Sequence, residues 1–312
     1  MERLKTLFFF TTLKESYNKD FLGWQNRVSV GVQPKFSVAS VHPGLAGKVP
    51  EQLDFFNNQS IMGIVYANVF YFVVCLFLYV AMKQRSKPFQ IYNLIRVYNL
   101  LCVFLAGYVV HGIIQHKWLA PGTFACNSMD VASDEGKKLA FVMWVYYAQK
   151  YFEFFDTFFF LLKQSWRQIS FLHLYHHSSI TFVTAAFITH DINGDSYLAA
   201  LLNSFIHVCM YGHYFLSSFG VKKTVGGKVK TLVFGVFPMW WRPYLTKMQL
   251  LQFTICWIQP VYAFYKGASC GYGDWLKVLM IIYQTTMFVL FMHFYTNAYK
   301  KTYPVRDEKK IQ

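Results

Sequence analysis

The chain has 312 residues, of which 55% are hydrophobic, 20% aromatic and 14% charged, and its formal net charge is +15. This apolar share exceeds what one soluble core of this length would bury, so the composition disfavours a soluble protein and indicates a membrane protein. The basic residues lie in the connections between apolar segments rather than on one soluble surface, which excludes nucleic acid as the expected partner.

The amino-terminal region, residues 1–60, carries no apolar stripe long enough for a stable helix. We predict that it forms a non-catalytic extension, which the charge pattern described below assigns to the lumenal side of the membrane. The triplet Asn58-Gln59-Ser60 has the pattern of a glycosylation site. It lies almost at the first apolar segment, where the bilayer would hinder a large modifying enzyme, so we give it little weight.

Seven apolar segments follow, and a helix needs about 20 mostly apolar residues to cross the hydrocarbon of a bilayer. They cover residues 61–82, 89–114, 139–162, 171–189, 197–219, 248–265 and 275–299. We therefore predict an all-α integral membrane protein with seven transmembrane helices, in a single domain over residues 61–299. The Gly-rich basic stretch 222–230 is predicted to be a flexible loop, and the short apolar stretch after it an interfacial segment.

The connections between these segments alternate in charge. The first, third and fifth connections and the tail are rich in Lys and Arg, whereas the other three contain few. The positive-inside rule therefore places the carboxyl-terminal tail, residues 300–312, in the cytosol and the amino end on the opposite side. Cys126 and Cys270 lie in connections on that opposite side, which is the oxidising face of a secretory-pathway membrane, so the two are candidates for a disulfide.

Polar side chains recur in four of the apolar segments, although a charged group near the bilayer centre costs about 3 kcal/mol on insertion scales. Their spacings of three and four residues keep them on one face of each helix. The positions are Lys150, Glu153, Asp156 and Thr157; His173, His176 and His177; Asn203, His207, Met210, Tyr211 and Tyr214; and Thr246, Gln249 and Gln252. Because lipid cannot satisfy these groups, we expect all four faces to turn toward one interior cavity.

A purely structural explanation competes with a chemical site. Lys150 and Glu153 can neutralise each other as an internal ion pair, and a lone buried histidine usually makes only a structural hydrogen bond. A neutralising pair would not need Asp156 as well, and the fourth segment presents three histidines on one face. The cost of burying so many polar groups on facing helices therefore favours a chemical site.

Two chemistries suit imidazoles in a membrane. In the first, His173 and His177 at i and i+4 chelate zinc or iron, with His207 as a further ligand. Membrane di-iron enzymes use several histidine boxes, and this chain has a single HxxHH box without a second box or a suitably spaced carboxylate, so we expect no metal. A metal-dependent lipid-modifying enzyme stays the alternative.

In the second chemistry, a neutral imidazole attacks a thioester to give an acyl-imidazole, and a neighbouring imidazole moves the proton. The amides of Asn203 and Gln249 can donate to a developing oxyanion without bringing charge into the cavity. The acyl chain would lie between helices rich in Phe and Tyr, while a polyphosphorylated carrier would meet the basic cytosolic rim.

The motifs occur together and in a fixed order: Lys150-x-x-Glu153-x-x-Asp156-Thr157, His173-x-x-His176-His177, Asn203-x-x-x-His207-x-x-Met210-Tyr211, and Thr246-x-x-Gln249-x-x-Gln252. With them, the chain resembles the ELO family of fatty acid elongases, the very-long-chain 3-oxoacyl-CoA synthases. His213 is the one departure, since the family usually has Tyr there, and it leaves the specificity of that region open.

The resemblance implies condensation of a long-chain acyl-CoA with malonyl-CoA to a 3-oxoacyl-CoA, with release of CO2 and CoA and without a cofactor or metal. It implies a multi-pass endoplasmic reticulum protein in which six of the seven helices surround an acyl-binding tunnel. Lys309-Lys310 near the end of the tail resembles a dilysine retrieval signal. The implied partners are the 3-oxoacyl-CoA reductase, the dehydratase and the enoyl reductase of the elongation cycle. A homo- or hetero-dimer is also implied.

The resemblance also assigns roles to residues. His176 corresponds to the histidine that accepts the acyl group and His207 to its partner. The remaining catalytic candidates are His173, His177 and Asn203, and the substrate-binding candidates are Lys150, Glu153, Asp156, Tyr211, Tyr214, Gln249 and Gln252. A concerted variant, in which the histidine acts only as a base, stays open. The segment containing Gln168 and Tyr175 resembles the branch of the family that acts on polyunsaturated acyl chains.

Overall fold

The computed structural model describes residues 61–118, 124–127, 133–191, 194–225, 228–233, 237–238, 241–267, 270 and 272–300. The predicted lumenal extension with its glycosylation triplet and the tail with Lys309 and Lys310 lie outside these residues, so the structure does not test those predictions.

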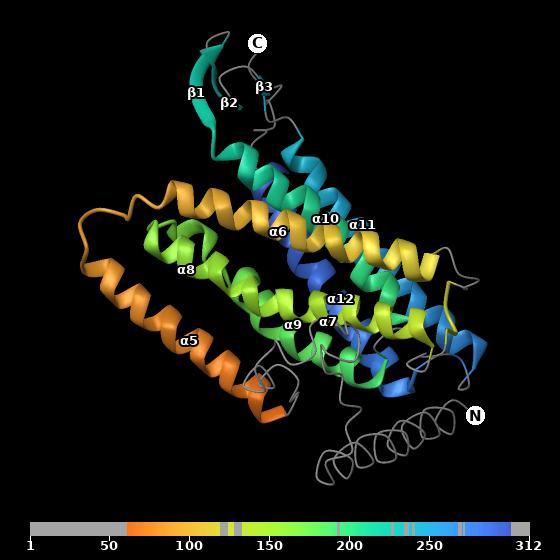
Figure 1. The fold of residues 1–312 in the computed structure, drawn as a ribbon. Helices are drawn as coiled ribbons and strands as arrows, with labels where there is room; N and C mark the ends of the chain where they lie inside the picture. The colour runs from red at the N-terminus through yellow and green to blue at the C-terminus, as the bar shows by residue number, and fades with distance from the viewer. Residues whose placement is uncertain are drawn as a thin grey trace, which may run out of the picture.

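Helices account for most of the described chain (Figure 1). They are α5 (Ile61–Gln84), α6 (Tyr92–Ile113), α7 (Asp134–Phe152), α8 (Phe154–Leu162), α9 (Phe171–His190), α10 (Ser196–Ser217), α11 (Arg242–Lys266) and α12 (Asp274–Tyr295). Short π-helical turns, η4 (Ile114–Trp118) and η6 (Thr296–Lys300), extend α6 and α12. Since α7 and α8 are interrupted only at Glu153, the described residues form seven helical segments at the predicted positions.

Six of these segments contact one another in a closed order, α6, α7, α9, α12, α11, α10 and back to α6. The seventh, α5, packs outside this ring against α8 and α9, where Figure 1 shows it along one edge of the molecule. Its buried residues Ile64, Asn68, Tyr71 and Cys75 recur every three or four residues and so form one stripe toward the ring. The remaining surface of α5 is exposed and largely apolar, as a lipid-facing helix requires.

The helices differ in how apolar they are, according to whether they carry a polar stripe. Three described stretches, Gly63–Gln84, Tyr92–Lys117 and Asp274–Ala298, are long and apolar enough on composition alone to cross a membrane. The segments formed by α7–α8, α9, α10 and α11 carry the polar stripes, which lower their hydropathy because these side chains turn into the protein rather than toward lipid. The chain is thus a multi-pass membrane protein.

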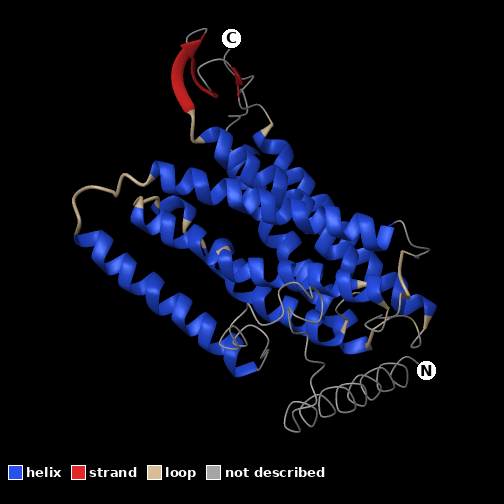
Figure 2. Cartoon of the chain, viewed as in Figure 1, coloured by secondary structure: helices blue, strands red, loops and turns tan. Residues whose placement is uncertain are grey.

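A small antiparallel sheet lies outside the helices. Strands β1 (Gly220–Val225), β2 (Lys228–Val233) and β3 (Phe237–Pro238) pair in the order β1-β2-β3, at one end of the molecule in Figure 2. The prediction of a flexible loop over 222–230 is therefore wrong, although the all-α prediction holds for the membrane part. The sequence carries the signal of a hairpin, since two glycines separate two stretches rich in Val and Thr.

Candidate active site

A buried ion pair on the α7–α8 segment links this segment to α10. Lys150 is only 1% exposed, and its Nζ donates to Glu153 Oε1 at 3.1 Å and to Asn203 Oδ1 at 2.9 Å. The predicted pairing of Lys150 with Glu153 is therefore present. Lys150 also holds the amide of Asn203 by its oxygen, which leaves the amide N–H2 of Asn203 as the group that can donate elsewhere.

The Glu153 carboxylate lies between this lysine and a histidine. It is fully buried, and its Oε1 is 2.9 Å from Nδ1 of His207 in α10, as an electrostatic contact without the alignment of a full hydrogen bond. A buried ion costs several kcal/mol unless it is compensated, and here a cation and an imidazole flank the carboxylate. His207 is thereby held through Nδ1, and its Nε2 points away from Glu153.

The histidine box opens α9. The Ser170 side chain caps the helix by accepting from the backbone N–H of His173 at 3.2 Å, as serine commonly does at this position. His173 Nε2 lies 2.8 Å from the hydroxyl oxygen of Thr157, which in turn lies 2.9 Å from the hydroxyl oxygen of Tyr71 on α5. The rings of His173 and His177 are 4.3 Å apart between centroids, and those of His176 and His177 are 5.4 Å apart. The three histidines thus lie together, as their spacing predicts.

Asp156 faces α10 rather than the histidines. The Tyr211 hydroxyl donates to Asp156 Oδ2 at 2.5 Å, and both side chains are buried. Tyr214 packs edge-on against Tyr211. These contacts connect α8 to α10 and fix the side of the ring on which His207 lies.

A cavity inside the ring reaches one of the box histidines. Its volume is about 40 Å³, and its walls come from α7, α9, α10, α11 and α12. The polar side chains in its lining are Tyr146, His176, Thr184, Ser196, Asn203, Gln252, Tyr283 and Gln284, and the others are apolar, among them Ile180, Val183, Phe187 and Met280. Of the predicted site residues, His176, Asn203 and Gln252 line this cavity.

The other candidates are not in the wall of this cavity, so the expectation that all four polar faces would line it is only partly correct. Lys150, Glu153 and His207 form the network described above, and Gln249 contacts the Met210 sulfur at 3.9 Å from its Nε2. The physical reason is that buried charges satisfy one another before they can face an apolar space.

Sequence reasoning missed the contribution of α12. Tyr283 is buried, lines the cavity and places its hydroxyl 3.3 Å from Nδ1 of His176. Its neighbour Gln284 is also buried and lines the cavity. The available signal was a Tyr-Gln pair in the middle of an otherwise apolar span, where polar residues are candidates for function.

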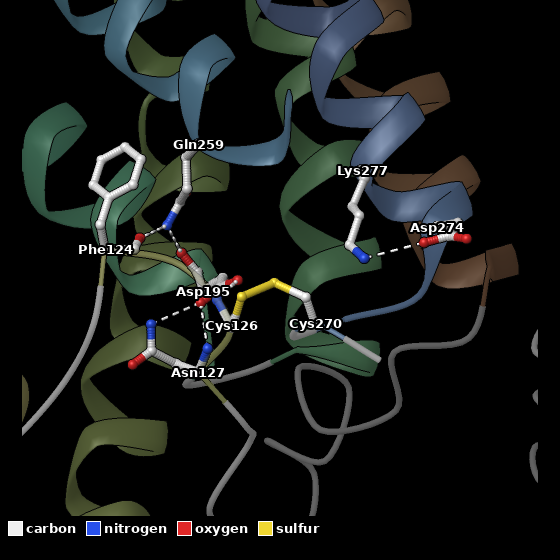
Figure 3. Close-up of a disulfide and its surroundings, with 8 residues drawn as sticks. All are labelled: Phe124, Cys126, Asn127, Asp195, Gln259, Cys270, Asp274 and Lys277. Atoms are coloured by element: carbon white, nitrogen blue, oxygen red, sulfur yellow. Dashed lines mark hydrogen bonds and ion pairs between the residues drawn. A yellow bond between two sulfur atoms is a disulfide. The ribbon is translucent and has the colours of Figure 1, made fainter. Parts of the chain in front are cut away.

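The end of the ring opposite the hairpin is closed by a covalent and hydrogen-bonded cap. Cys126 and Cys270 form the predicted disulfide (Figure 3). The buried Asp195 carboxylate accepts from the backbone N–H groups of Cys126 and Asn127 at 2.9 and 2.8 Å and from Asn127 Nδ2 at 2.7 Å. Gln259 Nε2 donates to the backbone oxygens of Phe124 and Asp195 at 2.9 and 3.0 Å. The cap therefore joins α10, α11 and the segment before α12.

Asp191, which follows α9 in this cap, is also buried. It accepts from the backbone N–H of Ser196 at 2.7 Å, but burial outweighs this bond and raises the pKa of the carboxyl to about 8. In the folded protein Asp191 therefore keeps its proton at neutral pH.

Among the described residues, no group of three or more His, Cys, Asp or Glu side chains is arranged to hold a metal ion. The contacts of the histidine nitrogens are instead with protein groups. Nε2 of His173 contacts Thr157, Nδ1 of His176 contacts Tyr283, and Nδ1 of His207 contacts Glu153.

The model of the ELO family (GNS1/SUR4 family) matches residues 56–307, which is most of the chain. The chain belongs to the ELO family. It is 32% identical over 232 residues to very long chain fatty acid elongase 2 of Mus musculus, covering 73% of this chain and 72% of that protein. It is 34% identical over 220 residues to elongase 5 of Mus musculus, covering 70% and 68%, and 31% identical over 223 residues to elongase 4 of Homo sapiens, covering 70% and 66%.

Membership of the ELO family makes the chain an enzyme of the fatty acid elongase class. The position where it departs from the usual family pattern has a structural contact: Nδ1 of His213 accepts from the indole Nε1–H of Trp241 at 3.0 Å. His213 thus links the end of α10 to the start of α11, on the side of the ring where the hairpin lies.

Proposed function

We propose that this elongase condenses a long-chain acyl-CoA with malonyl-CoA in the endoplasmic reticulum membrane and releases a 3-oxoacyl-CoA, CO2 and CoA. The observation that carries the proposal is the position of His176. Of the histidines in the buried polar network, it is the one that lines the described cavity, and Asn203 lines the same cavity. An acyl chain between apolar side chains would meet a nucleophile and an amide donor there.

The reaction is proposed to run in two steps. His176 attacks the thioester carbonyl of the acyl-CoA, so that a C–N bond forms, the C–S bond breaks and the CoA thiolate leaves. Malonyl-CoA then loses CO2, and its enolate attacks the acyl carbon, which forms the new C–C bond and releases the imidazole.

The neighbours of His176 support these steps. Asn203 donates its amide N–H to the enolate oxygen, since Lys150 already occupies its amide oxygen. His207, held at Nδ1 by Glu153, passes a proton from solvent through its Nε2 to the leaving CoA thiolate. No step is assigned to a cofactor or metal, and Gln252 is assigned to the wall of the acyl site.

The substrate is proposed to be a polyunsaturated acyl chain, lying in a tunnel between the six ring helices. Support comes from the resemblance around Gln168 and Tyr175 and from the apolar part of the cavity lining. The carboxyl-terminal tail, with its dilysine-type signal, is proposed to lie in the cytosol, and the extension over residues 1–60 in the lumen. The protein is proposed to form a dimer and to act together with the reductase, dehydratase and enoyl reductase that process a 3-oxoacyl-CoA.

The test is an assay of the detergent-purified protein with malonyl-CoA labelled at C2 and a panel of saturated and polyunsaturated acyl-CoAs, with a chelator and without reductant. A labelled 3-oxoacyl product is expected, in larger amount from polyunsaturated chains. His176→Ala and His207→Ala should each lower the rate at least 100-fold, on the scale of roughly 10²- to 10⁴-fold for acid–base groups. If folded protein that retains its metal makes no product, the histidine-box metalloenzyme becomes the better hypothesis.

A further inference from the structure

We propose that Tyr283 is a positioning residue that holds His176 with its proton on Nδ1 and so makes Nε2 the atom that accepts the acyl group. The inference rests on the proposed function, because it names the reacting nitrogen of the same histidine. It assigns a role to α12, the last segment of the helix ring, in which the sequence motifs placed no site residue.

The geometry of the contact defines which nitrogen is occupied. The Tyr283 hydroxyl lies 3.3 Å from Nδ1 of His176, and both residues line the cavity. Tyr283 is only 6% exposed, so no bulk water competes for this contact. With Nδ1 turned toward α12, the chemistry must take place at Nε2, on the opposite side of the imidazole ring.

The direction of the contact follows from the chemistry proposed for His176. A neutral imidazole has one N–H and one free lone pair, and the lone pair must be on the nitrogen that attacks the thioester. Because Nδ1 faces the Tyr283 hydroxyl, the attacking nitrogen is Nε2, so the proton is on Nδ1 and the Tyr283 oxygen accepts it.

This arrangement selects the reactive tautomer of a neutral imidazole, because a ring with its proton on Nδ1 carries its free lone pair on Nε2. When Nε2 attacks the thioester, the C–N bond forms and the C–S bond breaks. The thiolate leaves with the negative charge and takes its proton from solvent, while the acylated ring becomes positive. The Tyr283 oxygen, still accepting from Nδ1–H, stabilises this charge until the enolate displaces the imidazole and restores the starting tautomer.

The experiment compares two variants of the purified full-length protein and reads the tautomer of His176 from its ¹⁵N resonances. Tyr283→Phe removes the acceptor but keeps the ring. Tyr175→Phe is the matched control, because it removes a hydroxyl contact of 3.1 Å to Thr286 between the same two helices without touching His176. For each, the release of CoA from acyl-CoA before malonyl-CoA is added measures the acylation step, and thermal unfolding checks the fold.

The expected result is a fall of roughly 10- to 100-fold in acylation for Tyr283→Phe, the scale seen when an outer partner that orients a histidine is lost, with an unchanged KM for acyl-CoA. The ¹⁵N resonances of His176, identified by their absence from His176→Ala, should show the proton on Nδ1 in the wild-type protein. Tyr175→Phe should keep the wild-type rate.

Two results would overturn the inference: wild-type acylation in Tyr283→Phe, or a His176 proton on Nε2 in the wild-type protein. Failure of the proposed function itself looks different, since the wild-type protein would then make no 3-oxoacyl product. If Tyr283→Phe is unstable, the ¹⁵N resonances of the wild-type protein carry the test, because they report the tautomer of His176 without any substitution at Tyr283.

Discussion

Two regions of the molecule bury charged groups but satisfy them in different ways. One is the polar network of Lys150, Glu153, Asn203 and His207, and the other is the cap around the disulfide. In the cap, Asp195 accepts from the backbone N–H groups of Cys126 and Asn127, next to the disulfide between Cys126 and Cys270. In the network, Glu153 is held by side chains from two helices, and His176 and Asn203 border a cavity. A region that only holds the fold together can satisfy its groups with backbone, whereas the region proposed to react keeps polar side chains at the wall of a cavity.

The largest effect is expected from removing the cation of the network. Lys150→Met leaves the Glu153 carboxylate buried with a single partner, so the free energy of unfolding should fall by about 3 to 5 kcal/mol, and condensation should be lost as Asn203 loses its anchor. Thermal unfolding in detergent and the labelled-malonyl assay measure the two effects.

The control is the double variant Lys150→Met with Glu153→Gln, which removes both charges. It should recover most of the stability and little of the activity, since its neutral pair no longer orients Asn203 and His207 in the same way. An active and stable Lys150→Met protein would show that this network resembles the cap and has no part in the reaction.

The next largest effect concerns pH and the cap. Burial raises the folded-state pKa of Asp191 to about 8, above the ordinary value near 4, so between these values the folded state holds a proton that the unfolded state has released. The free energy of unfolding should therefore decrease as pH rises, by up to about 4 kcal/mol from pH 5 to pH 8 at about 1.4 kcal/mol per pH unit. Below about pH 4 and above about pH 8 this contribution is constant.

Unfolding midpoints at pH 5 and pH 8 test this for the wild type and for Asp191→Asn, which cannot ionise and should show a flatter pH dependence. Asp134→Asn serves as the control, because the Asp134 side chain is 90% exposed and its substitution should leave the pH dependence unchanged. Equal pH dependence in the wild type and Asp191→Asn would mean that the cap binds this carboxylate in its charged form.

Sequence patterns predicted contacts within a helix better than contacts between helices. The pairing of Lys150 with Glu153 follows from a spacing of three residues, and the disulfide from the shared side of its two connections. Tyr71 and Tyr283 could not be found in this way, because neither belongs to a polar stripe of three- and four-residue spacing, and each reaches the histidines only through the packing of α5 and α12. The number and approximate limits of the helices were predictable from apolar length, although α7 and α11 begin five and six residues earlier than predicted. Their order around the ring depends on tertiary packing.

The smallest effect is expected from the link between α5 and the histidine box. Tyr71→Phe keeps the stacking of the ring on Phe154 at 4.3 Å between centroids but removes the hydroxyl that contacts Thr157. The loss of one buried hydrogen bond should lower the free energy of unfolding by roughly 1 kcal/mol. Because Thr157 keeps its contact to His173, condensation should slow by only a few fold. The matched control is Tyr66→Phe on the same helix, whose side chain is 60% exposed and should change neither quantity. If Tyr71→Phe instead abolished condensation with its stability unchanged, the reacting region would extend beyond the ring to α5, and the network would include a helix that the ring arrangement leaves outside.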